Sequence, residues 1–239
     1  VNCRPLEWGA DIVTHSTTKY MDGHGSAVGG AIVDGGNFDW AAHADKFPGL
    51  TQHDPSYHNL VYADTFGNGG AFITKATVQL MRDFGSIQSP QSAFYLNLGL
   101  ESLHVRMVQH CKNGQAVAEA LVNNPKVAHV SYPGLPGDKY YELAQKYLPN
   151  GSCGVITVDV AGGREAAEKF LGNLKVFSIA THVADARSCC LHPASSTHRQ
   201  LTDEELVAAG ITPGTVRLSC GIEGTEDLIN DVEQALAAL

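Results

Sequence analysis

The second half of the chain alternates short apolar runs with amphipathic stretches. Runs such as G-V-I-T-V-D-V predict strands over 127–132, 154–160, 176–181 and 215–219, with an extended stretch over 188–192. Helical spacing between these runs predicts helices over 139–148, 164–172, 203–209 and 225–238. This alternation favours an α+β layer, in which helices cover one face of a sheet.

The first half of the chain has a different pattern. Short β-branched runs predict strands over 11–14 and 27–33, whereas 40–69 is aromatic, polar and Pro-bearing and is expected to form a long ordered loop. Helical periodicity marks 71–84 and 90–123, the second of which starts at a proline and is followed by another at 125. A helix as long as the second one often joins two domains.

Composition narrows the class of protein. Hydrophobic residues make up 44% of the 239 residues and charged residues 17%, which excludes collagen-like, coiled-coil and disordered classes. Sixteen basic against 25 acidic residues give a net charge of −9, so a general nucleic-acid or anionic-membrane surface is not expected. No apolar run approaches the roughly 20 residues of a membrane span, and no signal-peptide pattern is present. These two features predict a cytoplasmic protein. Six cysteines without a C-x-x-C motif predict reduced thiols.

A lysine flanked by small hydroxyl residues, in the string Ser16-Thr17-Thr18-Lys19-Tyr20, follows the first predicted strand. A cofactor that carries both an aldehyde and a phosphate needs such a set, because the amine forms a Schiff base and the hydroxyls donate to phosphate oxygens. The spacing alone leaves open an exposed lysine in a polar turn, since short strings of this kind are common.

Three ordered blocks resemble the Cys/Met metabolism family of enzymes that depend on pyridoxal 5′-phosphate (PLP). The blocks are G-A-D-I-V-T-H-S-T-T-K-Y-M-D-G-H-G at 9–25, A-D-A-R-S-C-C-L-H-P-A-S-S-T-H at 184–198 and V-R-L-S-C-G-I-E-G-T-E-D-L-I at 216–229. The resemblance runs over essentially the whole chain. It implies an α/β fold, the C-terminal part of a PLP-dependent transferase fold of the aspartate-aminotransferase type, with PLP as cofactor. Residues 1–102 are then the C-terminal portion of the large PLP-binding domain, with an inserted loop at about 40–69, and 103–239 form a small α+β C-terminal domain.

The resemblance also implies roles for individual residues. Lys19 becomes the catalytic Schiff-base lysine, which moves protons once substrate has displaced it, and Ser16 and Thr18 become phosphate contacts. Arg217 becomes the residue that grips the α-carboxylate of the substrate in a bidentate pair. The residues alone leave an intramolecular salt bridge as the other role for this arginine. His182 stands where many relatives have Ser or Asn, and it is a candidate for shaping the substrate-binding pocket or, equally, a packed or capping residue.

No metal site is predicted. His192 and His198 lie near each other in sequence, but no carboxylate or cysteine stands at a ligand-like spacing from them, so they are expected to hold a loop. Cys189, Cys190 and Cys220 are expected in core positions, because no activating base is evident beside them.

The resemblance implies chemistry at Cγ or Cβ of an amino acid. The insertion F-P-G-L-T-Q-H-D-P-S-Y-H at 47–58 is similar to that of O-acetylhomoserine sulfhydrylases. The expected reaction is therefore γ-replacement, in which acetate leaves the substrate and sulfide or a thiol adds to give homocysteine or methionine. An α,γ-elimination of the cystathionine or methionine γ-lyase type stays open as an alternative, and so does a catalytically silent structural partner.

The resemblance has consequences for partners as well. The family places a glycine-rich phosphate loop, a ring-stacking tyrosine and a pyridine-pairing aspartate upstream of the lysine, and only 18 residues precede Lys19. We therefore expect this chain to be the C-terminal part of a longer enzyme and to be inactive without the N-terminal segment. The shared active sites of the family imply a homo-oligomer, a dimer of dimers.

Overall fold

A computed structural model describes all 239 residues and divides them into two compact units. The sheet unit comprises Val1–Cys3, Thr18–Ala27 and Tyr95–Leu239, and the hairpin unit comprises Arg4–Thr17 and Val28–Phe94. The units therefore part at 94/95, and residues 18–27 belong with the later part of the chain. The division into domains at 102/103 concerns the complete enzyme fold and stays a prediction.

The sheet unit contains a five-stranded sheet in the order β3-β4-β7-β6-β5. Its neighbouring strands are antiparallel except for β5 and β6, which run parallel, and Val158 on β4 lies opposite Val216 on β7. The strands are β3 (Val127–Ser131), β4 (Val155–Val160), β5 (Ser178–Ile179), β6 (Cys189–Leu191) and β7 (Thr215–Ser219).

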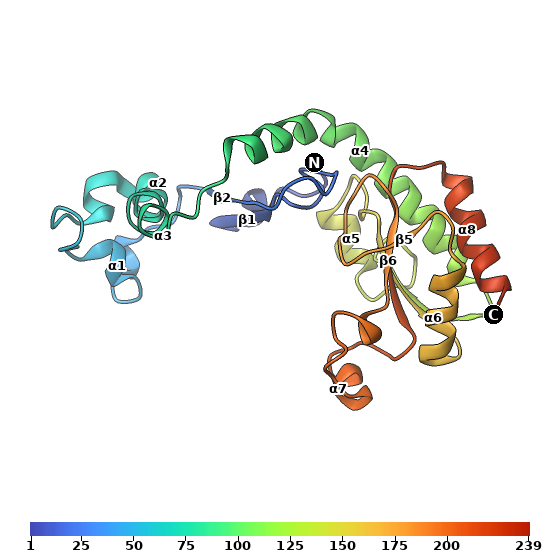
Figure 1. The fold of residues 1–239 in the computed structure, drawn as a ribbon. Helices are drawn as coiled ribbons and strands as arrows, with labels where there is room; N and C mark the ends of the chain where they lie inside the picture. The colour runs from blue at the N-terminus through green and yellow to red at the C-terminus, as the bar shows by residue number, and fades with distance from the viewer. The chain divides into compact units, whose positions relative to one another are not determined.

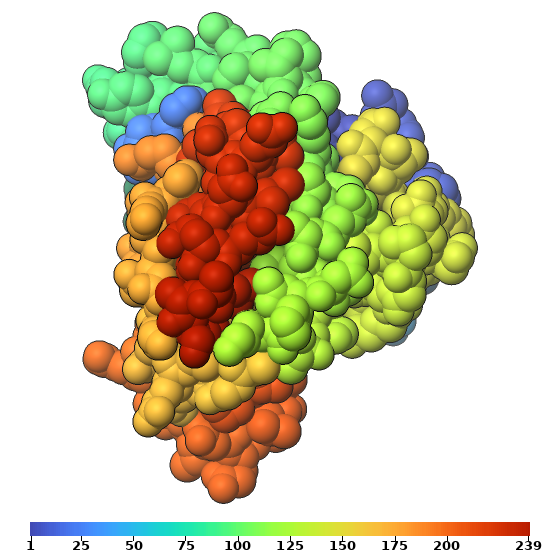
Figure 2. Space-filling view, turned by 90° about the vertical axis from the view of Figure 1, so that its right-hand side faces the viewer, coloured from blue at the N-terminus to red at the C-terminus, as the bar shows by residue number.

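Helices cover one face of this sheet, as the alternation in the sequence predicts. They are the second half of α4 (Pro90–Val122), α6 (Gly163–Asn173) and α8 (Thr225–Ala237), and α8 lies beside α4 in Figures 1 and 2. Their apolar stripes and the inward residues of the strands form one core, whose fully buried members include Val117, Leu121, Ile156, Phe170, Leu218 and Val232. Each such side chain stabilises the fold by about 1.5–3 kcal/mol through its burial.

Shorter elements complete the sheet unit: α5 (Tyr141–Tyr147), η4 (Pro193–Ser195) and α7 (Asp203–Ala208). Helix α7 begins with a capping box, because the Thr202 hydroxyl accepts from the Glu205 amide and the Glu205 carboxylate accepts from the Thr202 amide.

The hairpin unit contains a two-stranded antiparallel sheet and a helical region. Strand β1 (Ile12–Ser16) pairs with β2 (Gly30–Asp34), with Val13 opposite Val33. The unit's own small core consists of Trp40, Leu50, Tyr62 and Ala71. Its helical elements are η1 (Pro5–Trp8), η2 (Ala41–His43), α1 (Pro48–Thr51), α2 (Tyr62–Lys75), the π-helical segment η3 (Ala76–Met81) and α3 (Arg82–Phe84).

Several predicted elements differ from the structure. The stretch 40–69, expected as a loop, contains the short helices η2 and α1, and the strand expected over 27–33 lies at Gly30–Asp34. The helix predicted over 71–84 begins earlier, at Tyr62, and the non-helical Gly67 (φ 65°) kinks its first turns, which hides the helical period in the sequence. The strand predicted over 176–181 shrinks to Ser178–Ile179. Its first residues cannot pair in the sheet, because the amides of 175–177 donate to the Asp231 carboxylate on α8 instead.

None of the helices has the length and apolar character that a membrane crossing requires.

Candidate active site

The lysine turn, which we define as residues 18–26 of the sheet unit, is a tightly bonded loop. The Gly23 amide donates to the Lys19 carbonyl over 2.8 Å, and the Asp22 carboxylate accepts from the Ser26 amide over 2.9 Å and from the Ser26 hydroxyl. The Lys19 side chain is half-buried, and no hydrogen bond or ion pair engages its ammonium group. No polar contact of the side chain therefore fixes the position of this amine, which depends on the backbone of the turn.

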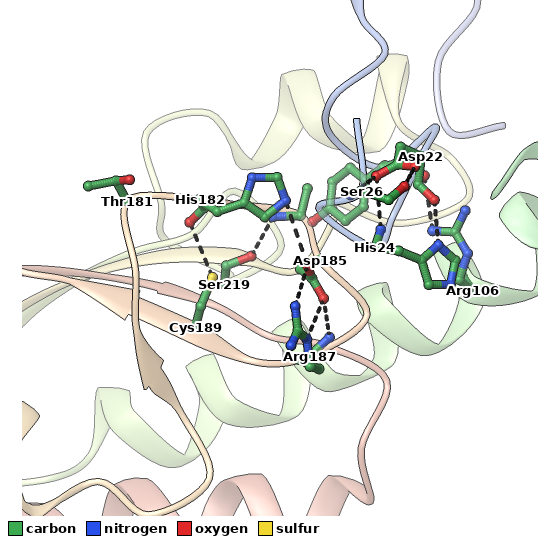
Figure 3. A network of polar contacts seen from close by, with 12 residues as sticks. Asp22, His24, Ser26, Arg106, Thr181, His182, Asp185, Arg187, Cys189 and Ser219 are labelled. Carbon is green, nitrogen blue, oxygen red and sulfur yellow. Dashed lines mark hydrogen bonds and ion pairs between the residues drawn. The ribbon is translucent and has the colours of Figure 1, made fainter. Parts of the chain in front are cut away.

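Asp22 closes the turn as an ionised carboxylate. Its side chain is buried, which by itself raises its pKa. The hydrogen bonds from the hydroxyl and amide of Ser26 and from the His24 amide outweigh burial and hold the pKa of Asp22 below its ordinary value of 3.8. The His24 ring also folds back, with Nδ1 2.7 Å from the Asp22 carbonyl oxygen (Figure 3). His24 is thus a turn residue.

Tyr20 anchors the turn to the body of the sheet unit. Its hydroxyl accepts from the Gly154 amide over 3.0 Å, and its ring packs edge-on against the buried His110. Burial raises the pKa of the Tyr20 phenol well above its ordinary value, so the hydroxyl stays protonated. Tyr20 is therefore a packing residue.

Arg217 lies on the face of the sheet that the helices leave uncovered. Its neighbours on β7, Val216 and Leu218, belong to the helix-covered core, and alternate residues of a strand point to opposite faces. Its Nη2 donates to the carbonyls of Thr181 and His182 over 3.0 and 2.9 Å. It forms no ion pair, and its buried Nε has no hydrogen-bond partner. The intramolecular salt bridge that the sequence left open is therefore not present.

A guanidinium in this state is suited to an external carboxylate. Two main-chain carbonyls fix the orientation of Arg217, while the rest of its donor fork has no partner in the chain. Arg binds carboxylates through two parallel N–H donors, and the unpaired Nε supplies one of them. The chemistry of this donor set therefore fits the carboxylate end of an amino acid.

The segment 181–189 runs past Arg217 and is strained at one residue. Ala184 has φ 68°, a left-handed conformation that favours glycine, and its buried amide donates to the Ser219 hydroxyl over 2.9 Å. The Cys189 thiol donates to the His182 carbonyl over 3.2 Å (Figure 3). The hydrogen bond from its amide helps to hold Ala184 in this strained conformation.

His182 and Asp185 face each other without a hydrogen bond. His182 Nε2 lies 3.8 Å from Asp185 Oδ2 and has no hydrogen-bond partner although it is buried. Asp185 is held instead by the guanidinium of Arg187, at 3.2 Å from Nε, and the two residues form a structural pair. Burial opposes ionisation of Asp185, but the hydrogen bonds from Arg187 lower its pKa below the ordinary value.

A cavity of about 360 Å³ joins this segment to the lysine turn within the sheet unit. The Gly23 carbonyl of the turn accepts from the Ala186 amide over 2.8 Å, so the two segments are bonded to each other. The cavity is lined by Gly25, Ser178, Ala180, His182, Asp185, Arg187, Ser188 and Cys189. It is therefore an open space beside His182 and next to the turn that carries Lys19.

The predicted site residues have different placements. Arg217 and His182 are in direct contact, and Thr18 and Lys19 share the lysine turn of the same unit. No hydrogen bond joins Lys19 to Arg217. Ser16 is the exposed last residue of β1 and belongs to the hairpin unit.

The loop-holding histidine and the core cysteines are where the sequence predicts them. His192 is buried, with Nδ1 2.8 Å from the Ser195 hydroxyl and Nε2 2.8 Å from the Pro213 carbonyl. Cys189, Cys190 and Cys220 are all buried, and burial raises the pKa of the Cys190 thiol to about 12.

Sequence reasoning missed the residues behind the site. Arg106 on α4 is 5% exposed and donates to the Tyr20 carbonyl of the lysine turn. Glu223 accepts from the amide and hydroxyl of Ser188 beside the cavity. In the sequence, Arg106 stands out only as a charged residue next to Met107 on the apolar face of a predicted helix. The spacing does not reveal which groups such a charge contacts.

The residues present fit PLP. An aldehyde requires an amine without a competing partner, and Lys19 provides it. A PLP-bound amino acid brings an α-carboxylate, and the unpaired Nε of Arg217 suits it.

Comparison with known proteins gives the family. The model of the Cys/Met metabolism PLP-dependent enzymes matches residues 1–237. The chain is 47% identical to O-acetyl-L-homoserine sulfhydrylase from Leptospira meyeri, over 97% of this chain and 54% of the relative. It is 44% identical to homocysteine synthase from Schizosaccharomyces pombe, over 98% of this chain and 54% of the relative. The chain thus spans about half the length of these curated relatives.

A solved structure confirms the predicted fold class. A Campylobacter jejuni protein described as an O-acetylhomoserine (thiol)-lyase, which carries N′-pyridoxyl-lysine-5′-monophosphate, superposes with a TM-score of 0.88 at 36% identity. The match covers 98% of this chain and 56% of that one.

Proposed function

We propose, since the chain belongs to the Cys/Met metabolism family of PLP-dependent enzymes, that it carries the catalytic lysine and the carboxylate-binding arginine of an O-acetylhomoserine sulfhydrylase. The reaction is γ-replacement at O-acetylhomoserine: acetate leaves Cγ, and sulfide or a thiol adds there to give homocysteine or methionine. The observation that carries the proposal is the presence in one unit of two cations that form no ion pair, the Lys19 ammonium and the Arg217 guanidinium. The names of the relatives supply the reaction class.

Each residue has a defined part in this proposal. When bound, PLP supplies an aldehyde for the lysine and an electron sink for negative charge that develops on the substrate. Lys19 removes the proton from substrate Cα and returns protons later in the reaction. Arg217 holds the α-carboxylate, so that the bond to be broken keeps one orientation. Ser16 and Thr18 donate to the phosphate, and His182 borders the carboxylate pocket.

The proposal includes a complete, oligomeric enzyme. We expect polypeptide equivalent to the unmatched half of the relatives to complete the site, and residues 1–239 alone to be inactive. An apolar groove of about 680 Å³ in the hairpin unit, with Ile32, Ile73 and Phe84 among its lining residues, offers a surface for that polypeptide. A dimer of dimers in the cytoplasm is the proposed assembly and location.

Product analysis tests the reaction class. The full-length protein is incubated with PLP and O-acetylhomoserine, once with sulfide and once without. Homocysteine that forms only with sulfide, and that Lys19→Ala abolishes, supports γ-replacement. If 2-oxobutyrate is the main product under both conditions, the enzyme is an eliminating lyase and the proposed reaction is wrong.

A further inference from the structure

The lysine turn rests on helix α4 at an unusually close approach. Gly99 of α4 faces the carbonyls of Met21 and Asp22, and a Cβ at this position would overlap both of them. Only glycine therefore lets the turn lie against the helix axis here. One turn of helix further on, the same face of α4 presents Ser102 and then Arg106.

Arg106 is buried beneath the turn without a carboxylate partner. Its Nη1 donates to the Tyr20 carbonyl over 2.9 Å, its Nη2 to the Gly99 carbonyl over 2.7 Å and its Nε to the Ser102 hydroxyl over 3.0 Å. Burial lowers the pKa of this guanidinium, and the more distant charges of Asp22 and Asp185 only partly offset that effect. A buried cation that lacks an ion pair is costly, so packing alone does not account for an arginine here.

The guanidinium also fits closely against the turn. Gly23 has φ 73°, and a Cβ at this position would overlap the Arg106 guanidinium. The Gly23 amide in turn donates to the Lys19 carbonyl. Two consecutive carbonyls of the turn thus each accept a hydrogen bond. Gly23 donates to the carbonyl of Lys19, and Arg106 donates to that of Tyr20.

We propose that Arg106 is a positioning residue for Lys19, which fixes the place of its amine by holding the Tyr20 carbonyl and supporting Gly23. This proposal rests on the proposed role of Lys19. Because no group of the chain binds the Lys19 ammonium, its place depends on the backbone of the turn. An arginine can hold that backbone and α4 at once through three separate donors, and a lysine cannot.

Two readouts test the proposal in the full-length protein. The first is hydrogen exchange of the apoprotein, followed in peptides that cover 18–26. In Arg106→Met these amides should exchange about tenfold faster or more, because the turn loses a charge-assisted hydrogen bond. The second is a pH titration of the visible absorption of the PLP complex, whose midpoint should shift in Arg106→Met and return partway in Arg106→Lys.

The controls separate positioning from general damage. Arg164 on α6 likewise donates to a main-chain carbonyl, that of Ala194 over 3.0 Å, but it does not touch the lysine turn. Arg164→Met should leave both readouts at their wild-type values. Should Arg106→Met fail to fold, Ser102→Ala keeps the guanidinium but removes its Nε acceptor, and it should speed exchange over 18–26 by a smaller factor.

Opposite results are equally clear. The positioning role is wrong if Arg106→Met shows wild-type exchange over 18–26 and an unchanged titration midpoint. If Arg106→Met does not fold, the same two results in both Ser102→Ala and Arg106→Lys would overturn the role. A wild-type absorption band that Lys19→Ala retains would overturn the proposed function instead. The exchange data would then decide by themselves whether Arg106 holds the turn.

Discussion

Replacing Arg217 by lysine should weaken the grip on the substrate carboxylate. Nη2 of Arg217 already donates to the carbonyls of Thr181 and His182, whereas its Nε and Nη1 have no partner in the chain. A lysine has one ammonium, which would have to choose between those carbonyls and the carboxylate. The loss of one charge-assisted hydrogen bond is worth about 1.5–3 kcal/mol. This corresponds to a fall of about 10- to 150-fold in kcat/KM for O-acetylhomoserine.

Steady-state kinetics of the full-length enzyme measure this effect. One series should vary O-acetylhomoserine at saturating sulfide, and a second should vary sulfide at saturating O-acetylhomoserine. Only the first should show the effect, because only the amino-acid substrate has an α-carboxylate. Arg4→Lys is a matched control, since Arg4 is an exposed arginine paired with Glu7. Arg217→Lys with kcat/KM within about twofold of wild type, or with its main effect on sulfide, would refute the assigned role.

Three further predictions concern stability and reactivity. Asp231→Ala should lower the free energy of unfolding by about 3–5 kcal/mol in urea titrations, because it leaves the amides of 175–177 without their acceptor. The hydrogen bond from Lys75 lowers the pKa of Asp54 from 3.8 to about 2, so the stability that this pair contributes is present above about pH 4 and is lost as the pH falls through 2. The unfolding midpoint of wild type, followed by tryptophan fluorescence, should therefore fall over that range more steeply than that of Asp54→Asn. Because the pKa of the Cys190 thiol is about 12, iodoacetamide at pH 8 should label Cys190 in the unfolded protein but leave it intact in the folded one, as peptide mass spectrometry can check.

The elements with a clean hydrophobic period were predictable. Strand β4 alternates buried and half-buried residues along its length, and α8 repeats its apolar residues at helical spacing, so both match their predicted ranges closely. Strand β5 was overestimated because Asp231, more than 50 residues away, takes the amides that precede it. The start of α2 was missed because glycines interrupt its first turns.

The residues of the candidate site also fall into those that the sequence reveals and those that it does not. Lys19 and Arg217 are conspicuous in sequence, since each stands in a distinctive motif, and the structure places both in the sheet unit. Arg106 could not be identified from spacing, because its partner Tyr20 lies 86 residues away in sequence and meets it only through a tertiary contact. The left-handed conformation of Ala184 could not be predicted either, because a lone alanine in the sequence does not indicate a positive φ.

A covalent bond between Lys19 and PLP can be tested most directly by reducing the complex of the full-length protein and PLP with borohydride, and then mapping the modified peptide by mass spectrometry. The pyridoxyl group should be found on Lys19, and the same treatment of Lys19→Ala should leave the peptide of residues 9–25 without the label. Modification of another lysine, such as Lys46 or Lys75, to the same extent in both proteins would contradict the assignment of Lys19 as the catalytic lysine.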